Sequence, residues 1–251
     1  MSPVYVYGVG LAADCAAVDV SGVEGGQVRP VEHAGLAALV SPVDGGALAA
    51  AREIRSHWRV LEEACGGTTV LPVRFGTLME DEQAVRERLL EPNAERLEHA
   101  LRELAGRVQL NVRGDYNEEQ LMRDVVTRSR AVAELRDHIR TLPNEAGYYE
   151  RIRLGELVAS EVGHRRAEDT RLAIEMLEPV ATGVREEELR SSDAAFNLAC
   201  LVERERQDAF GKEVRRLGEE LGDRISLHYV GPLPPYSFAD IELGSEAAAW
   251  A

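Results

Sequence analysis

The side chains that most often bind metals or act as catalysts are scattered along this sequence. Its six histidines show no HxxxH or HExxH spacing, so surface or packing roles are expected for them. Cys15, Cys65 and Cys200 are an odd number without close spacing, which fits neither a zinc site nor a disulfide framework. There is no GxSxG nucleophile elbow and no glycine-rich phosphate loop with its lysine. The sequence therefore predicts no catalytic residue, no cofactor and no metal, and an enzyme is not expected.

Two other stretches contain side chains that are unusual for their position. Arg74 and Phe75 stand in the apolar run VLPVRFGT, where a buried guanidinium would need a partner, and a structural ion pair is favoured over a ligand contact. Tyr236 and Phe238 follow three prolines in GPLPPYSF, a rigid segment that ends the last strand. We expect these rings to fasten the tail across the fold, onto the LPVRFGT region, with part of the strip left for a partner. Arg74, Phe75, Tyr236 and Phe238 are thus the candidate partner-binding residues.

Composition and charge restrict the class of protein. The chain has 251 residues, 45% of them apolar, which is enough for two modest domains. Twenty-nine basic residues against 44 acidic ones give a formal charge of -15, which repels nucleic acid and anionic lipid. No apolar run reaches about 18 residues, and the first residues lack the pattern of a signal peptide. We therefore expect a cytoplasmic protein with reduced cysteines, whose partners are neither nucleic acid nor membrane.

Residues 1–105 predict an N-terminal α+β domain. Strands are expected at 4–10, in a hairpin within 27–43 that turns at Gly35, and at 69–77, where Pro72 implies a sheet edge or a bulge. Helices are expected at 47–64 and at 81–104, the second kinked or divided at Pro92. The apolar spacing of the first helix predicts an inward face of Leu48, Ile54, Trp58 and Leu61.

Residues 106–251 predict a second domain with a long helical hairpin and a proline-rich tail. The strand 107–116 alternates strictly, and Asn117 is a good N-cap for a helix that runs to 142. A second long helix is expected at 148–177, with Ile152, Val158, Val162, Leu172 and Met176 inward. A weak strand at 184–189, the doubly apolar strand FNLACLV, a helix and the strand ISLHYV complete a βαββαβ order. This order is that of a modified ferredoxin-like unit whose central pair is the first and third strands.

Several stretches together resemble the GvpL/GvpF family of gas vesicle proteins. In chain order they are VYVYGV, GLAALVS, HWRVLEEA, TVLPVRFGT, GRVQLNVRGDY, GYYERIR, FNLACLVERERQDAF and GPLPPYSFADIEL, and they span nearly the whole chain. LPVRFGT and GPLPPYSF are the most specific of them. Relatives commonly have tryptophan in the last motif where this chain has Leu233, so a large ring is missing from any partner contact there.

The resemblance implies two α+β domains, the second a modified ferredoxin-like fold, and a role without catalysis in building gas vesicles. These are the protein-walled, gas-filled flotation compartments of some bacteria and archaea. It also implies contact with the small, hydrophobic major shell protein GvpA and with other accessory proteins. The main hypothesis is therefore an assembly factor or minor structural protein that covers aggregation-prone apolar surface, while its own acidic charge keeps the complex dispersed.

Two alternatives stay open at this point. A ligand-responsive regulatory or enzymatic ferredoxin-like domain would need a closed pocket with convergent polar groups near Arg74 or at the domain junction. A structural scaffold would self-associate through the helical hairpin between Asn117 and Pro179, although packing of the two helices on each other explains the same apolar pattern.

Overall fold

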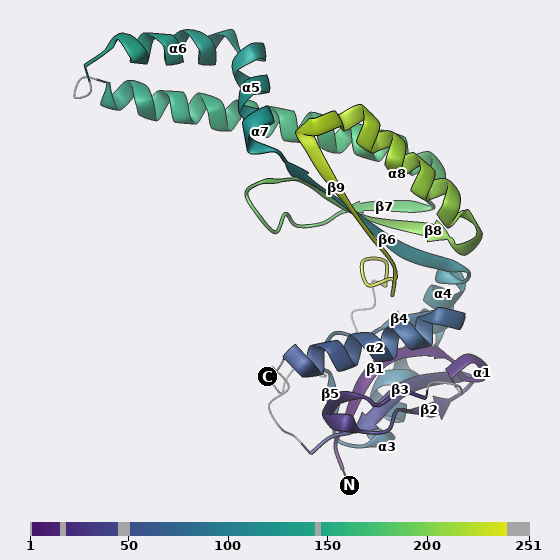
Figure 1. The fold of residues 1–251 in the computed structure, drawn as a ribbon. Coiled ribbons are helices and arrows are strands. Elements are labelled where there is room, and N and C mark those ends of the chain that lie inside the picture. Colours follow the sequence, from purple (N-terminus) through teal and green to yellow (C-terminus); the bar gives the residue numbers. More distant parts are fainter. Residues whose placement is uncertain (1, 16–18, 45–50, 144–146, 240–251) are drawn as a thin grey trace. The chain divides into compact units, whose positions relative to one another are not determined.

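The computed structural model describes residues 2–15, 19–44, 51–143 and 147–239. The chain is an α+β protein with two antiparallel sheets (Figure 1). It divides into two compact units by its internal contacts. Unit 1 comprises residues 1–109 and 231–251, and unit 2 comprises residues 110–230.

The sheet of unit 1 is built around β1 (Val4–Leu11). Its strand order is β2 (Arg29–His33), β3 (Leu36–Pro42), β1 and β4 (Val70–Pro72), and β5 (Leu78–Met79) also pairs with β1. The predicted hairpin is confirmed: β2 and β3 are antiparallel, and the turn between them contains Gly35 at φ 85°. Pro72 lies at the sheet edge, as predicted, because proline cannot donate to a second neighbouring strand.

The helices of unit 1 are α1 (Ala12–Cys15), α2 (Ala51–Gly67), α3 (Glu82–Ala84) and α4 (Ala94–Leu104). Between α3 and α4 the chain continues as a π turn (Val85–Leu90) and a 3-10 turn (Glu91–Asn93). The predicted helix 81–104 is therefore divided at Pro92, because the proline ring has no N–H and clashes with the preceding turn. The Asp81 carboxylate caps α3 by accepting the Ala84 N–H at 2.8 Å.

The inward face of α2 differs from the prediction. Ile54 is 41% exposed, and Leu48 lies outside the described residues. The buried positions are Glu53, Ser56, His57, Val60, Leu61 and Ala64. Polar residues are tolerated on this face because they have partners: the Glu53 carboxylate, for example, accepts the Glu24 N–H at 2.9 Å.

The sheet of unit 2 has the strand order β7 (Gly183–Glu186), β8 (Ala194–Glu203), β6 (Arg107–Tyr116) and β9 (Ile225–Leu233). The FNLACLV run is thus a central strand, as predicted. α8 (Gln207–Leu221) buries the four residues expected from its spacing, Phe210, Val214, Leu217 and Leu221. Gly114 is required in β6, because a Cβ there would stand 2.8 Å from the Phe196 ring.

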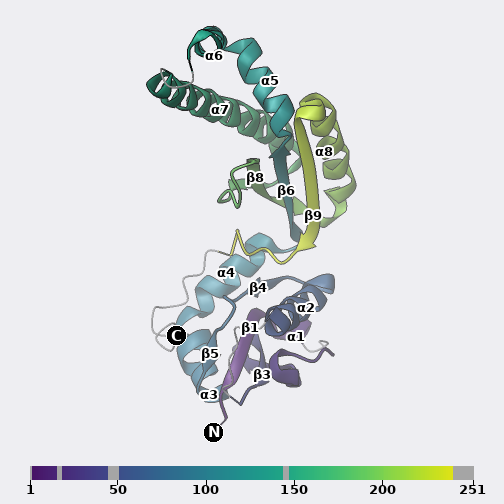
Figure 2. The same cartoon turned by 60° about the vertical axis from the view of Figure 1, so that its left-hand side comes forward.

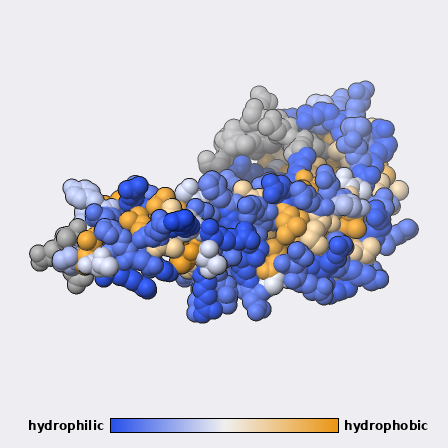
Figure 3. All heavy atoms as spheres, turned by 90° about the horizontal axis from the view of Figure 1, so that it is seen from above, coloured by the Kyte–Doolittle hydropathy of each residue, from blue (hydrophilic) through white to orange (hydrophobic). Residues whose placement is uncertain are grey.

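A helical hairpin projects from unit 2 (Figures 1 and 2). It consists of α5 (Glu118–Arg128), α6 (Arg130–Thr141) and α7 (Tyr148–Leu177). The predicted helix 118–142 is two helices, because Ser129 is extended at φ -97° and ψ 102°, and its hydroxyl donates to the Glu161 carboxylate at 2.8 Å. Asn117 caps α5 as predicted. Apolar side chains lie among polar ones along the hairpin (Figure 3), so its seam is only partly covered.

The expected inward face of α7 is also partly wrong. Ile152 is 45% exposed, whereas Asp169, Ala173 and Leu177 are buried. The second half of α7 packs on β8, and the first half extends beyond the sheet (Figure 1). Spacing alone therefore identified the helix but not which part of it is covered. No helix in the described ranges is long and apolar enough to cross a lipid bilayer.

The division into units differs from the predicted boundary between residues 105 and 106. The segment from Gly231 onward groups with unit 1 rather than with the second domain. Two hydrogen bonds account for this. The Tyr236 hydroxyl is bonded to His57 of α2, and the Ser237 N–H donates to the buried Gln109 side chain at 2.9 Å.

Candidate interaction site

The two stretches that sequence analysis selected meet on unit 1. Phe75 and Tyr236 are both partly buried, and both pack against the core cluster that contains Tyr5 and Tyr7. After β4, the carbonyl of Arg74 accepts both the N–H and the hydroxyl of Thr77, which closes a tight turn around Phe75. The prediction that the tail packs across the fold is confirmed for Tyr236, which contacts His57 and Trp58 of α2, while Phe75 contacts the same His57 ring. A direct contact between the tail and the LPVRFGT region stays a prediction.

His57 of α2 links the tail to β1 through both of its ring nitrogens. Its Nδ1 lies 2.9 Å from the Tyr5 hydroxyl, and its Nε2 lies 2.5 Å from the Tyr236 hydroxyl. The Tyr5 oxygen also accepts the Gly76 N–H at 2.9 Å. The imidazole is 1% exposed, and its one donor and one acceptor are both used. One buried ring therefore holds β1, the turn after Arg74 and the tail together.

Aromatic contacts surround this hydrogen-bonded chain. The ring centroids of Trp58 and Tyr236 are 5.1 Å apart, those of His57 and Phe75 are 5.5 Å apart, and those of Tyr5 and Phe75 are 6.1 Å apart. These distances fall within the range that tilted and edge-to-face pairs prefer, about 4.5–7 Å. The rings thus form a packed aromatic layer, and Tyr236 is held by both packing and a hydrogen bond.

Burial keeps this network uncharged. It lowers the pKa of His57 to about 4, because the charged imidazolium would lose its hydration. It raises the pKa of the Tyr5 and Tyr236 hydroxyls above their ordinary value for the same reason. At neutral pH all three groups are neutral, and the two hydrogen bonds of the imidazole join uncharged partners. The arrangement is that of a polar packing core rather than of an acid–base centre.

The other two predicted residues have different environments. The prediction of an ion pair for Arg74 is wrong. The Arg74 side chain is exposed and makes no ion pair with any residue that the structure describes. The reason is that β4 ends at Pro72, so Arg74 has already left the sheet. Phe238 is half-buried, and its N–H donates to the Pro235 carbonyl at 3.0 Å.

Sequence reasoning missed the role of His57. It treated the six histidines alike, although one signal distinguished this one. His57 precedes Val60, Leu61 and Ala64 by three, four and seven positions, which is the spacing of a buried helix face.

Tyr236→Phe tests the hydrogen bond alone. We expect it to lower the free energy of unfolding by about 1 kcal/mol, because a buried ring nitrogen loses its partner while the aromatic contacts remain. Urea unfolding followed by circular dichroism measures the change. Tyr149→Phe is the matched control, since Tyr149 is 81% exposed. Equal stability of the two variants would contradict the assignment.

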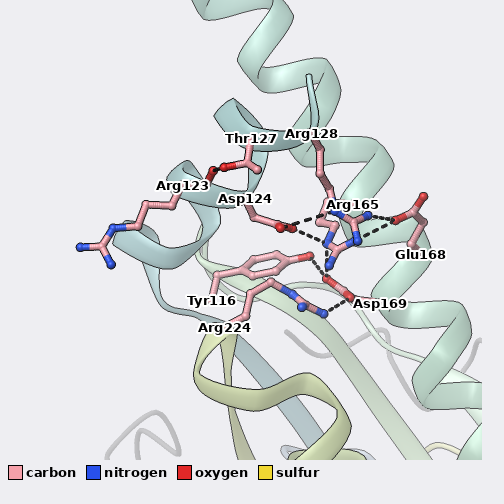
Figure 4. A network of polar contacts seen from close by, with 9 residues as sticks. All are labelled: Tyr116, Arg123, Asp124, Thr127, Arg128, Arg165, Glu168, Asp169 and Arg224. Carbon is pink, nitrogen blue, oxygen red and sulfur yellow. Dashed lines mark hydrogen bonds and ion pairs between the residues drawn. The ribbon is translucent and has the colours of Figure 1, made fainter. Parts of the chain in front are cut away.

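A second polar cluster lies in unit 2 at the base of the hairpin (Figure 4). Asp169 of α7 is 3% exposed; its carboxylate accepts the Tyr116 hydroxyl at 2.9 Å and pairs with Arg224 at 2.7 Å. Arg165 pairs with three carboxylates, at 3.0 Å from Glu168, 3.1 Å from Asp124 of α5 and 3.6 Å from Asp169. The cluster connects β6, α5, α7 and the turn before β9. Its opposite charges pair with one another, although the Nε atoms of Arg165 and Arg224 are buried without a hydrogen-bond partner among the described residues. Such paired, buried charges are typical of a structural network.

Comparison with known proteins identifies the family of the chain. Residues 3–240 match the family described as Gas vesicle synthesis protein GvpL/GvpF. The chain is similar to gas vesicle protein F of Streptomyces sp. (strain CB03234), at 34% identity over 239 residues, which cover 94% of this chain and 99% of that protein. It is also similar to gas vesicle protein F of Nostoc sp., at 28% identity over 198 residues, with 77% and 80% covered.

Solved structures agree with these matches. The crystal structure of the gas vesicle protein GvpF from Anabaena sp. PCC7120 has a TM-score of 0.81 at 26% identity, covering 96% of this chain and 97% of that one. GvpF from Microcystis aeruginosa has a TM-score of 0.80 at 23% identity, covering 96% and 100%, and supports the fold. The resemblance noted in the sequence motifs is confirmed. The chain therefore belongs to the non-enzymatic GvpL/GvpF family of gas vesicle proteins, as a homologue of gas vesicle protein F that functions in gas vesicle formation.

Proposed function

We propose that this chain is an accessory or minor structural protein of gas vesicle assembly that binds the hydrophobic major shell protein GvpA and other accessory proteins. The observation that carries the proposal is the family match over residues 3–240. Because this match includes unit 2 and most of unit 1, we assign the role to the whole architecture and not to one domain.

The charge of the chain suits such a role. A shell protein with large apolar surfaces aggregates unless those surfaces are covered before it is deposited. A partner with a formal charge of -15 would keep the resulting complex dispersed by mutual repulsion. We place this step in the cytoplasm, at the growing gas vesicle.

We assign the contact with the shell protein to Arg74, Phe75, Tyr236 and Phe238 on unit 1. Arg74 is exposed, and the three rings are half-buried, so each ring presents part of its surface outward. Arginine and aromatic side chains are the residues most enriched at the centres of protein interfaces. The hydrogen bond between His57 and Tyr236 fixes the tail on α2, so little conformational entropy of the tail is lost when a partner binds.

Arg74→Glu tests this surface without disturbing the core, because the side chain is exposed. We expect about a tenfold loss of shell protein co-purified from cells that produce both proteins. Arg59→Glu is the matched control: it makes the same charge change at an exposed position of α2 in the same unit. Absence of GvpA from the wild-type complex would overturn the proposed function. Equal recovery with both variants would overturn only the assigned surface.

We further infer that unit 2 is a modified ferredoxin-like unit. Its elements follow the order strand, helical segment, strand, strand, helix, strand, and the sheet order β7-β8-β6-β9 puts the first and third strands at the centre. The modification is the helical hairpin, which takes the place of a single first crossover helix.

A further inference from the structure

One face of α7 changes from covered to exposed along the helix. In the second half this face packs on β8: Arg166 donates to the Ala194 carbonyl at 3.0 Å, and Ala173 and Leu177 are fully buried. Extending the same spacing of three and four toward the N-terminus gives Gly163, Ala159, Gly155, Ile152 and Tyr148. All five are exposed. The sheet-facing stripe of α7 thus continues for about four more turns with no described part of unit 2 over it.

This exposed stripe consists of uncharged residues, three of which are small. Tyr148 is 62% and Ile152 45% exposed, and none of the five residues is charged. A Cβ added at Gly155 or Gly163 would meet no described atom within 4 Å, so packing inside the chain does not require glycine at either position. Glycine inside a helix is destabilising relative to alanine. Small residues on a helix face do, however, allow a second helix to approach closely.

The stripe leads into a groove that is already formed. The groove has a volume of about 480 Å³ and lies between α7 and the connection from β7 to β8. Gly163 and Thr170 line it from α7, and Leu189 and Asn197 line it from the other side. Leu189 is 39% exposed. Figures 1 and 2 both show the β7–β8 connection on the sheet side of α7. The apolar face and the groove therefore form one continuous surface.

Carboxylates gather at the groove end of this surface, whereas the α7 part carries both signs, at Arg151, Arg153 and Glu156. Glu186 and Glu187 line the groove, Glu188 follows them, and none of the three makes an ion pair with a described residue. The two arginines of the groove are engaged, Arg166 by main-chain carbonyls and Arg171 by Glu175 at 3.7 Å. With a net charge of -15, a second copy of the chain is repelled, whereas a basic partner is attracted.

We propose that the face of α7 from Tyr148 to Gly163, together with the adjoining groove, binds one amphipathic α-helix of another protein. The contact face of that helix is apolar, and its flanks carry basic side chains, which pair with the carboxylates of Glu186, Glu187 and Glu188. The face is about 24 Å long, which accommodates a helix of four to five turns. This contact lies in unit 2 and is independent of the shell-protein surface proposed on unit 1.

A synthetic peptide tests the proposal directly. The probe is a labelled helical peptide of about 18 residues with an alanine and leucine stripe and lysine flanks, titrated with the full chain and followed by fluorescence anisotropy. We expect saturable binding that Gly155→Leu combined with Gly163→Leu weakens at least about tenfold. Replacing all three glutamates, Glu186→Gln, Glu187→Gln and Glu188→Gln, should weaken binding and reduce its dependence on salt.

Two controls separate this contact from general attraction of a cationic peptide. Ser160→Leu adds the same bulk on another exposed face of α7 and should leave binding unchanged. Gly155→Ala with Gly163→Ala should raise the melting temperature by a few degrees, since alanine favours the helix and meets no clash. Equal binding by all variants, or equal binding of a peptide with glutamate flanks, would overturn the proposal. So would a dimer in light scattering that Gly155→Leu abolishes, because a second copy would then be the occupant.

Discussion

Asp169→Ala is expected to lower the free energy of unfolding by about 3–5 kcal/mol, because removing one member of a buried ion pair leaves its partners without compensation. In this chain the groups left behind are the Tyr116 hydroxyl and the guanidinium of Arg224. Arg165 keeps its ion pairs with Asp124 and Glu168. These groups come from β6, from the turn before β9 and from α7 itself. The loss should therefore affect the attachment of the hairpin to the sheet, and urea unfolding followed by circular dichroism measures it.

A surface ion pair on the same helix provides the control for Asp169. Glu175→Ala removes a carboxylate that lies 3.7 Å from Arg171 and is 65% exposed, and we expect a change of at most about 0.5 kcal/mol. Asp169→Asn should fall between the two, because it keeps the size of the side chain but removes its charge. A loss for Asp169→Ala no larger than that for Glu175→Ala would show that the network does not stabilise unit 2.

Acidification from pH 6.5 to about pH 4 is expected to remove about 3 kcal/mol of stability through His57 alone. In the unfolded chain the imidazole takes up a proton with a pKa near 6.5, whereas in the folded chain burial lowers that pKa to about 4. Between these values the unfolded state binds more protons, so stability falls as the pH falls. The contribution is complete above pH 6.5, and the loss levels off below pH 4.

The pH effect is measured as a difference between variants, because carboxylates titrate in part of the same range. His57→Gln should flatten the dependence of unfolding free energy on pH between 4 and 6.5, although the variant is less stable at pH 7. His138→Gln changes an exposed histidine of α6 and should keep the full slope of the parent chain. An unchanged slope in His57→Gln would rule out a neutral, buried imidazole in the folded state.

Local patterns predicted the parts of this fold that depend on neighbouring residues. Strict alternation identified β6, the side chain of Asn117 identified the start of α5, and the spacing from Phe210 to Leu221 identified the buried face of α8. The errors at Ile54 and Ile152 have a different origin. Apolar spacing shows that a helix has an apolar face. Which stretch of that face is buried depends on how far the neighbouring sheet extends along the helix.

The candidate site was predictable to the same limited extent. An arginine in an apolar run and aromatic rings after three prolines are unusual for their positions, so composition pointed to both stretches. The histidine that joins them could not be found in this way, because its bond to Tyr236 spans 179 positions of the chain. The ion pair predicted for Arg74 is wrong because the strand ends at Pro72, two residues before Arg74, whereas the apolar run predicted a strand that continues to residue 77.

The return of the tail to unit 1 determines the order in which the protein can be completed during translation. Unit 2 lies wholly within residues 110–230, so the ribosome has made all of it before Tyr236 is added. Until then His57 has no hydroxyl for its second nitrogen, and the aromatic layer of unit 1 lacks one ring. Unit 1 is therefore the first unit whose synthesis begins and the last whose packing is completed. This order reverses the usual one, in which the N-terminal domain folds first during translation.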